Sequence, residues 1–220
     1  METLQDKTAI VLGASSAYGA ATARMLGREG AAVVLGGRSR DKLEALEEEI
    51  VSSGGRAVSL GVHLAKRHHL EHLVEAAVET FGGPDILVFA ARAFSPPLKS
   101  LDVEAFERSV DVNVKGLLYT LTAVLPAMQE TGGGHVVYLG PEQPEDEDPL
   151  YEAGLAAADV LLRESCRAFG SGGGYELASC LSRQIWRPSS APRPSAAHCS
   201  PRMRRPQGSR PTGFEHLSPW

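Results

Sequence analysis

A glycine-bearing loop near the start of the chain is the segment best suited to bind a phosphate. The apolar run Ala9–Leu12 leads into Gly13-Ala14-Ser15-Ser16-Ala17-Tyr18-Gly19, and a helical pattern follows. Glycines at a strand-to-helix turn let the backbone approach a diphosphate, and the helix start supplies N–H donors and a positive dipole. A tight turn that binds nothing is the alternative. The residues predicted to contact a dinucleotide are Gly13, Ser15, Ser16, Tyr18 and Gly19.

Histidines gather in one predicted helix, where metal ligation is the chemistry to consider. His68 and His72 lie four residues apart and share a helix face, as two metal ligands can. No third ligand is evident, so the pattern favours a solvated helix face and predicts no metal site. The two loop serines also lack a nearby His or acid that would activate a nucleophile.

The elements that would position these groups alternate between strands and helices over the first 170 residues. Apolar runs end near residues 12, 35, 60, 90 and 139, and helical patterns cover 19–26, 41–53, 66–81, 103–128 and 150–169. Such alternation indicates right-handed βαβ units. We predict an α/β fold with a Rossmann-type doubly wound parallel sheet, and a perturbation of the long helix at Pro126.

Composition places most of the chain among ordinary globular proteins. The 220 residues (23.4 kDa) are 43% hydrophobic and 22% charged, which excludes collagen-like, coiled-coil and fully disordered classes. No apolar run approaches the ~20 residues of a membrane span, and the first residues do not resemble a secretory leader. The three cysteines are too scattered for a disulfide framework or a zinc site. We expect a cytoplasmic protein with no membrane partner.

The pattern changes after Gly170, where a glycine-serine run begins. Residues 187–220 hold six Arg, seven Pro and one acidic residue. Such a segment buries too little apolar area to offset the entropy of ordering it. We predict a domain over 1–170 that lacks the last strands of the sheet, with the strand at 135–139 as its edge, and a disordered tail over 171–220. The tail lacks interleaved aromatic residues, so we expect no nucleic-acid partner.

Several motifs together resemble the short-chain dehydrogenase/reductase family over about residues 5–170. The family's loop reads T-G-x-x-x-G-x-G, and this chain keeps the first and last glycines with Ala17 in place of the middle one. Gly-Gly-Pro-Asp-Ile-Leu-Val at 82–88 resembles the entry to the family's fourth strand. Asn113-Val114-Lys115-Gly116 matches its N-x-x-G motif, and Tyr151-Glu152-Ala153-Gly154-Leu155-Ala156-Ala157 lines up with Y-x-A-x-K-A-A.

The resemblance implies an NAD(P)-dependent oxidoreductase that interconverts a small-molecule carbonyl compound and a secondary alcohol. It implies that Tyr151 is the acid/base and that Asn113 supports it in a proton relay. It places His63 where the family has an acid beside the adenine. The family's N-N-A-G segment near the cofactor, which includes the Ala90 position, reads Phe89-Ala90-Ala91-Arg92 here. It also implies a homo-oligomer that pairs through the long helices at 103–128 and 150–169.

The residues after the second predicted strand bear on the choice of cofactor. NAD-binding folds place an acid here for the ribose 2′-hydroxyl, whereas an Arg accommodates the 2′-phosphate of NADP. The strand is followed by Gly36-Gly37-Arg38-Ser39-Arg40, and no acid occurs before Asp41. Arg38, together with Ser39 and Arg40, is therefore suited to a 2′-phosphate. We therefore predict NADP, with NAD less favoured. The alternative is a solvated Arg at the start of the next helix.

The catalytic set implied by the resemblance is incomplete. The family's lysine falls at Leu155, and its serine falls at Gly140 or Pro141. A tyrosine with the ordinary pKa of about 10 is a poor base near neutral pH without a nearby positive charge. We therefore predict impaired turnover. Two other hypotheses stay open: a non-catalytic NADP-binding module, and a truncated or frameshifted product that does not fold fully.

Overall fold

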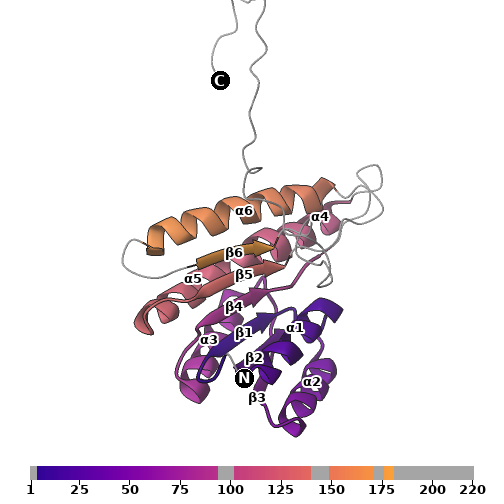
Figure 1. Cartoon of the computed structure of the whole chain (residues 1–220). Coiled ribbons are helices and arrows are strands. Elements are labelled where there is room, and N and C mark those ends of the chain that lie inside the picture. Colours follow the sequence, from indigo (N-terminus) through magenta and orange to yellow (C-terminus); the bar gives the residue numbers. More distant parts are fainter. Residues whose placement is uncertain (1–3, 94–101, 140–148, 171–175, 181–220) are drawn as a thin grey trace, which may run out of the picture. The chain divides into compact units, whose positions relative to one another are not determined.

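A single parallel sheet with helices on both faces organises the residues that the structure, a computed structural model, describes: 4–93, 102–139, 149–170 and 176–180 (Figure 1). The strand order is β3-β2-β1-β4-β5-β6. The strands are β1 (Thr8–Leu12), β2 (Ala32–Gly37), β3 (Arg56–Gly61), β4 (Ile86–Phe89), β5 (His135–Leu139) and β6 (Glu176–Cys180). This arrangement confirms the predicted α/β fold with a Rossmann-type parallel sheet.

The order of the strands reverses at β1. This strand pairs with β2 on one side and with β4 on the other, both in parallel. In open α/β sheets, ligands bind in the crevice outside the carboxyl ends of the strands at such a switch point. The topology therefore places a candidate site beyond Leu12 and Phe89.

Side-chain alternation along each buried strand builds two apolar layers. In β1, Ala9 and Val11 pack toward one layer, whereas Ile10 and Leu12 pack toward the other. The first layer is covered by α1 (Ala17–Arg28) and α2 (Arg40–Ser52). The second is covered by α3 (Arg67–Phe81), α5 (Gly116–Glu130) and α6 (Pro149–Gly170). A strand covered on both faces must be apolar throughout, as Ala9–Leu12 is.

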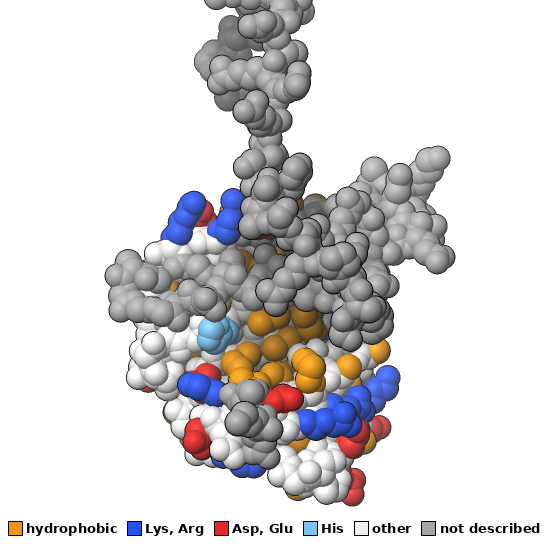
Figure 2. Space-filling model, in the orientation of Figure 1, with side chains coloured by type: hydrophobic (Ala, Val, Ile, Leu, Met, Phe, Trp, Pro, Cys, Tyr) orange, Lys and Arg blue, Asp and Glu red, His pale blue; other side chains and the backbone are white. Residues whose placement is uncertain are grey.

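Part of the α1–α2 layer stays accessible. Helix α1 contacts β1 and β2, and α2 contacts β2 and β3. On the same layer, Ile86 of β4 and Val137 and Leu139 of β5 are only partly buried. Figure 2 shows apolar side chains gathered in the middle of the visible face, with Lys and Arg side chains around them. Within the described ranges, no helix combines the length and the apolar character needed to cross a membrane.

One long helical segment joins α4 (Val103–Val110), the π-helical turn η2 (Asp111–Lys115) and α5. The predicted perturbation at Pro126 does not end the helix, because α5 continues through that residue. Burial of Leu121, Leu125 and Met128 holds the helix together although the proline removes one backbone hydrogen bond. The irregular turn is η2 instead, and single π turns within helices are frequent at functional sites.

The prediction that β5 forms the edge of the sheet is wrong. Strand β6 pairs in parallel with β5, from His135 opposite Glu176 to Leu139 opposite Cys180. Its sequence, Glu-Leu-Ala-Ser-Cys, lacks a run of β-branched or aromatic residues, so its propensity alone does not indicate a strand. Backbone pairing with β5 supplies what propensity does not. The rest of the predicted tail, 171–175 and 181–220, lies outside the described residues.

Candidate functional site

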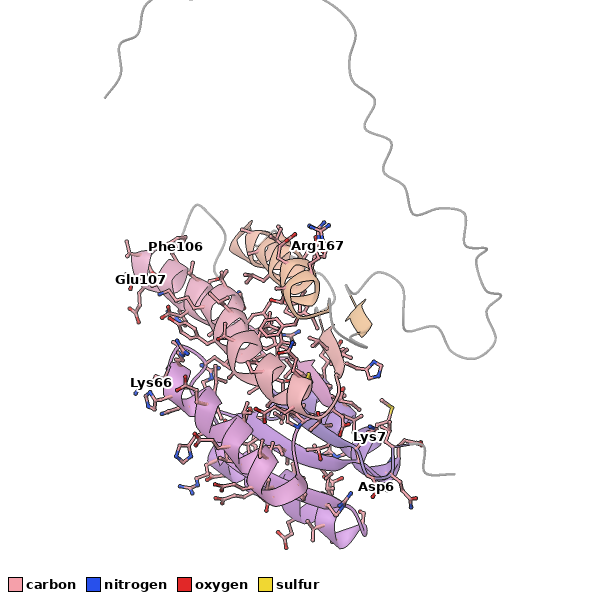
Figure 3. All side chains as sticks on the ribbon, turned by 90° about the vertical axis from the view of Figure 1, so that its left-hand side faces the viewer. Asp6, Lys7, Lys66, Phe106, Glu107 and Arg167 are labelled. Atoms are coloured by element: carbon pink, nitrogen blue, oxygen red, sulfur yellow. The ribbon has the colours of Figure 1, made fainter. Side chains whose placement is uncertain are left out.

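A cleft of about 470 Å³ opens at the carboxyl ends of the central strands. Its walls come from the loops after β1 to β4 and from α4 and η2. The residues that line it are Leu12, Gly13, Ser15, Ser16, Gly36, Gly37, Arg38, Val62, His63, Leu64, Ala90, Ala91, Arg92, Glu104, Glu107, Arg108, Asp111 and Val112. Figure 3 shows this end of the molecule, marked by Lys66, Phe106 and Glu107, opposite Asp6 and Lys7, which precede β1. The cleft thus lies at the switch point that the topology indicates.

The two glycines of the loop are required by close backbone packing. Gly13 has φ +80°, and a Cβ there would stand 2.6 Å from the backbone nitrogen of Ala91. A Cβ at Gly19 would overlap the carbonyl oxygen of Gly13. Only glycine therefore lets β1, the start of α1 and the loop after β4 meet so closely.

The start of α1 presents backbone donors without protein partners. The side chain of Ser16 caps the helix by accepting a hydrogen bond from the N–H of Gly19, at 3.1 Å. Within the described part of the chain, the N–H groups of Ser15, Ala17 and Tyr18 donate to no acceptor. The first turn of α1 carries no acidic residue, and the Ala17 side chain is exposed. The residues present therefore fit a bound diphosphate, which needs such donors.

The residues after β2 differ in their placement. Arg38 is exposed, lines the cleft and forms no ion pair with any described residue. Ser39 is the N-cap residue of α2 and is not among the lining residues. Arg40 donates to Glu44 at 3.0 Å and also lies outside the cleft wall. Of the cations near the end of β2, Arg38 is therefore the one available to a bound molecule.

His63 lines the cleft directly after β3, at the position where an adenine contact was predicted. Its backbone N–H donates to Nδ1 of His69 at 3.1 Å. Partial burial lowers the pKa of His69, and the neighbouring His68, Lys66, His63 and His72 lower it further. The neutral imidazole is the form that accepts this hydrogen bond, because the protonated ring has only donors. His69 therefore holds the loop that carries His63.

This contact predicts a pH-dependent stability. Because the folded chain lowers the pKa of His69, its contribution is present above the unfolded value of 6.5 and is lost as the pH falls from there through the folded pKa. We expect His69→Asn, whose side-chain oxygen can accept the same bond, to lose less stability than the native chain between about pH 7.5 and about pH 5.5. Urea unfolding at both pH values measures this, and equal losses in the two proteins would contradict the assignment.

Asn113 joins the cleft wall to the helices. It is 3% exposed and lies in η2. Its Oδ1 accepts from the N–H of Ala93 at 2.9 Å, and its Nδ2 donates to the Ala93 carbonyl at 2.8 Å and to Ser109 Oγ at 3.0 Å. A Cβ on Gly154 of α6 would stand 3.0 Å from Asn113 Cβ. Asn113 thus fixes the loop after β4 and lies against α6.

The helix that carries Tyr151 packs against this asparagine. Tyr151 lies on α6, three residues before Gly154. The side chains of Tyr151 and Leu155 lie outside the described part of the structure, as do residues 140–148, which include Gly140 and Pro141. Tyr138 of β5 is a poor alternative acid/base, because burial raises its pKa to about 12.

The sequence patterns did not reveal several charged residues of the cleft. The helical segment of α4 and η2 contributes four of them: Glu104, Glu107, Arg108 and Asp111. Asp111 pairs with Lys115 at 2.7 Å, a contact that raises the pKa of the lysine. Arg92 follows β4, and its place directly after a central strand is the signal that could have found it. No cluster of three potential metal ligands occurs among the described residues.

Comparison with known proteins identifies relatives of this chain. The model of the short chain dehydrogenase family matches residues 7–167. The glycine betaine reductase ATRR of Emericella nidulans is 44% identical over 135 residues, which are 61% of this chain but only 11% of that protein. An uncharacterized oxidoreductase of Staphylococcus haemolyticus is 38% identical over 166 residues, 74% of this chain and 71% of that protein.

A solved structure agrees with these sequence matches. A metagenomic short-chain oxidoreductase in complex with NADP superimposes with a TM-score of 0.71 and 29% identity, covering 80% of this chain and 81% of that one. The matched family segment contains the glycine loop, Asn113 and Tyr151. The strand order, the cleft at the switch point and these matches lead to one conclusion: the chain belongs to the short-chain dehydrogenase/reductase family of oxidoreductases.

Proposed function

We propose that this chain binds NADPH in the cleft at the carboxyl ends of β1 to β4, and that it is an oxidoreductase with impaired turnover toward carbonyl compounds or secondary alcohols. The single observation that carries the binding proposal is the start of α1. There, the N–H groups of Ser15, Ala17 and Tyr18 have no acceptor among the described residues, and Ser15 and Ser16 line the same cleft as Arg38. A bound NADPH would supply the hydride; the chain supplies its binding, its orientation and the proton.

The preference for NADP rests on Arg38. Its guanidinium has no ion-pair partner among the described residues, so it can pair with a ribose 2′-phosphate without breaking another contact. No carboxylate of α2 precedes Asp41 to favour a 2′-hydroxyl instead. Gly13, Ser15 and Ser16 would hold the diphosphate, and His63 and Ala90 would contact the adenosine half.

The proposal of impaired turnover rests on the composition of the catalytic set. Tyr151 would hold and transfer the proton, and Asn113 would position the surrounding elements. Leu155 offers no charge to lower the pKa of the tyrosine, which needs a nearby cation to act near neutral pH. Leu155 also favours the second candidate function, a nucleotide-binding module without turnover.

Arg38→Ala tests the cofactor proposal. We expect the dissociation constant for NADPH to rise about 10- to 100-fold, the range for losing a charged hydrogen bond, while that for NADH changes little. Arg40→Ala is the matched control, because Arg40 pairs with Glu44 outside the cleft wall. Titrations followed by nicotinamide fluorescence measure both constants. An equal loss for the two cofactors would contradict the role of Arg38.

A further inference from the structure

We propose that Arg92 binds the diphosphate of the dinucleotide, as a cation that this chain carries where the family's N-N-A-G segment ends in glycine. The inference rests on the proposed function and adds to it a contact that the family motif does not provide. Three features of the described residues carry it: the position of Arg92, its stacking partner, and the charge around the start of α1.

The backbone around Arg92 is fixed close to the glycine loop. The backbone of Ala90 and Ala91 touches Gly13 so closely that a Cβ on Gly13 would stand 2.7 Å from the carbonyl carbon of Ala90. Asn113 holds the following residue, Ala93, through both of its backbone groups. Arg92 is thus anchored on either side, and its side chain lines the same cleft as Gly13 and Ser15.

The stacking partner shows where the charge lies. The guanidinium carbon of Arg92 is 5.7 Å from the ring centroid of Tyr18, in the range of a cation–π contact. Tyr18 is the second residue of α1, and it is 50% exposed. The positive charge of Arg92 therefore lies beside the start of α1, where the N–H groups of Ala17 and Tyr18 have no acceptor among the described residues. A planar guanidinium there suits two oxygens of a diphosphate.

Local charge indicates that the place suits an anion. A cation beside the amino end of a helix is unfavourable, because both carry positive charge. The first turn of α1 has no acidic residue to compensate. The carboxylates of the cleft, Glu104, Glu107 and Asp111, belong to α4 and η2, and Asp111 already pairs with Lys115. A diphosphate placed there would interact favourably with the guanidinium of Arg92 and with the amino end of α1.

Nucleotide titrations of Arg92→Gln test the inference, with Arg92→Gly as a second variant that restores the family residue. Calorimetry would compare ADP with AMP, and fluorescence would compare NADPH with NADH. We expect both variants to bind NADPH and NADH about tenfold more weakly, by equal factors, and to lose most of the native preference for ADP over AMP. The salt dependence of NADPH binding should also become less steep.

Two comparison variants separate a local contact from a general effect of charge. Arg108→Gln removes a cation that α4 contributes to the same cleft, and we expect a smaller loss that ADP and AMP share. Arg40→Gln, outside the cleft wall, should bind like the native chain. Thermal unfolding confirms that each variant is folded. Native-like NADPH binding and ADP preference in Arg92→Gln would overturn the inference alone, whereas absence of dinucleotide binding by the native chain would overturn the proposed function with it.

Discussion

Replacing Asn113 with Leu should destabilise the domain by about 3 kcal/mol, because it leaves three polar groups without their partner. The buried amide satisfies the N–H and the carbonyl of Ala93 and the hydroxyl of Ser109, and leucine can satisfy none of them. The loop after β4, which lines the cleft, should then lose its fixed position, so NADPH binding should weaken as well. Urea unfolding and NADPH titration measure the two effects.

Ser109→Ala is the matched control for this prediction. It removes one hydrogen bond of the same network and leaves both bonds between Asn113 and Ala93 in place. We expect it to cost about 1 kcal/mol and to leave NADPH binding nearly unchanged. If Asn113→Leu were no more destabilising than Ser109→Ala, the asparagine would not be what holds this loop.

Restoring the family's lysine with Leu155→Lys should raise NADPH-dependent carbonyl reduction at least ~100-fold, the lower range for one positioned acid–base partner. A positive charge four residues after Tyr151 on α6 would favour the tyrosinate and lower the pKa of the hydroxyl. Aromatic aldehydes and cyclic ketones serve as substrates. Near-ultraviolet titration of tyrosinate gives a second readout that needs no substrate.

Two further variants show whether the charge of the lysine and the hydroxyl of Tyr151 cause any gain in carbonyl reduction. Leu155→Met keeps the size of the side chain without charge, and it should behave like the native chain. Tyr151→Phe in the Leu155→Lys background should remove both the added turnover and the new tyrosine ionisation. A gain that survives Tyr151→Phe, or a Leu155→Lys variant with unchanged titration, would contradict the assignment of the proton to Tyr151.

Much of the fold follows from the sequence because buried parallel strands and amphipathic helices leave strong patterns. Ala9–Leu12 and Ile86–Phe89 are continuous apolar runs, and the structure places both at the centre of the sheet. Strand β6 shows the limit of such patterns, because its pairing with β5 is a backbone interaction that its side chains barely indicate. The π turn at η2, Asp111–Lys115, likewise was not indicated by the periodicity of the sequence, which predicted one continuous helix over 103–128.

Some residues of the candidate site could also be predicted from the sequence, and others could not. Gly13, Ser15 and Arg38 could be predicted because each follows a recognisable strand, and the structure places all three in one cleft. Asp111 was not predicted, because its place in the cleft wall depends on how the turn η2 packs. Arg92 was not predicted either, although its position after a central strand is a signal that could have indicated it. Ser39 illustrates the opposite case, since it follows the right strand but occupies the N-cap position of α2.

Titration of the purified native chain with NADPH, followed by nicotinamide fluorescence and repeated with NADH, tests the central proposal most directly. We expect saturable binding of NADPH that is tighter than that of NADH, because Arg38 and the donors at the start of α1 would act together. Saturable binding of NADH alone would contradict the cofactor preference. Absence of binding at millimolar concentrations of either cofactor would contradict the proposal that this cleft binds a dinucleotide.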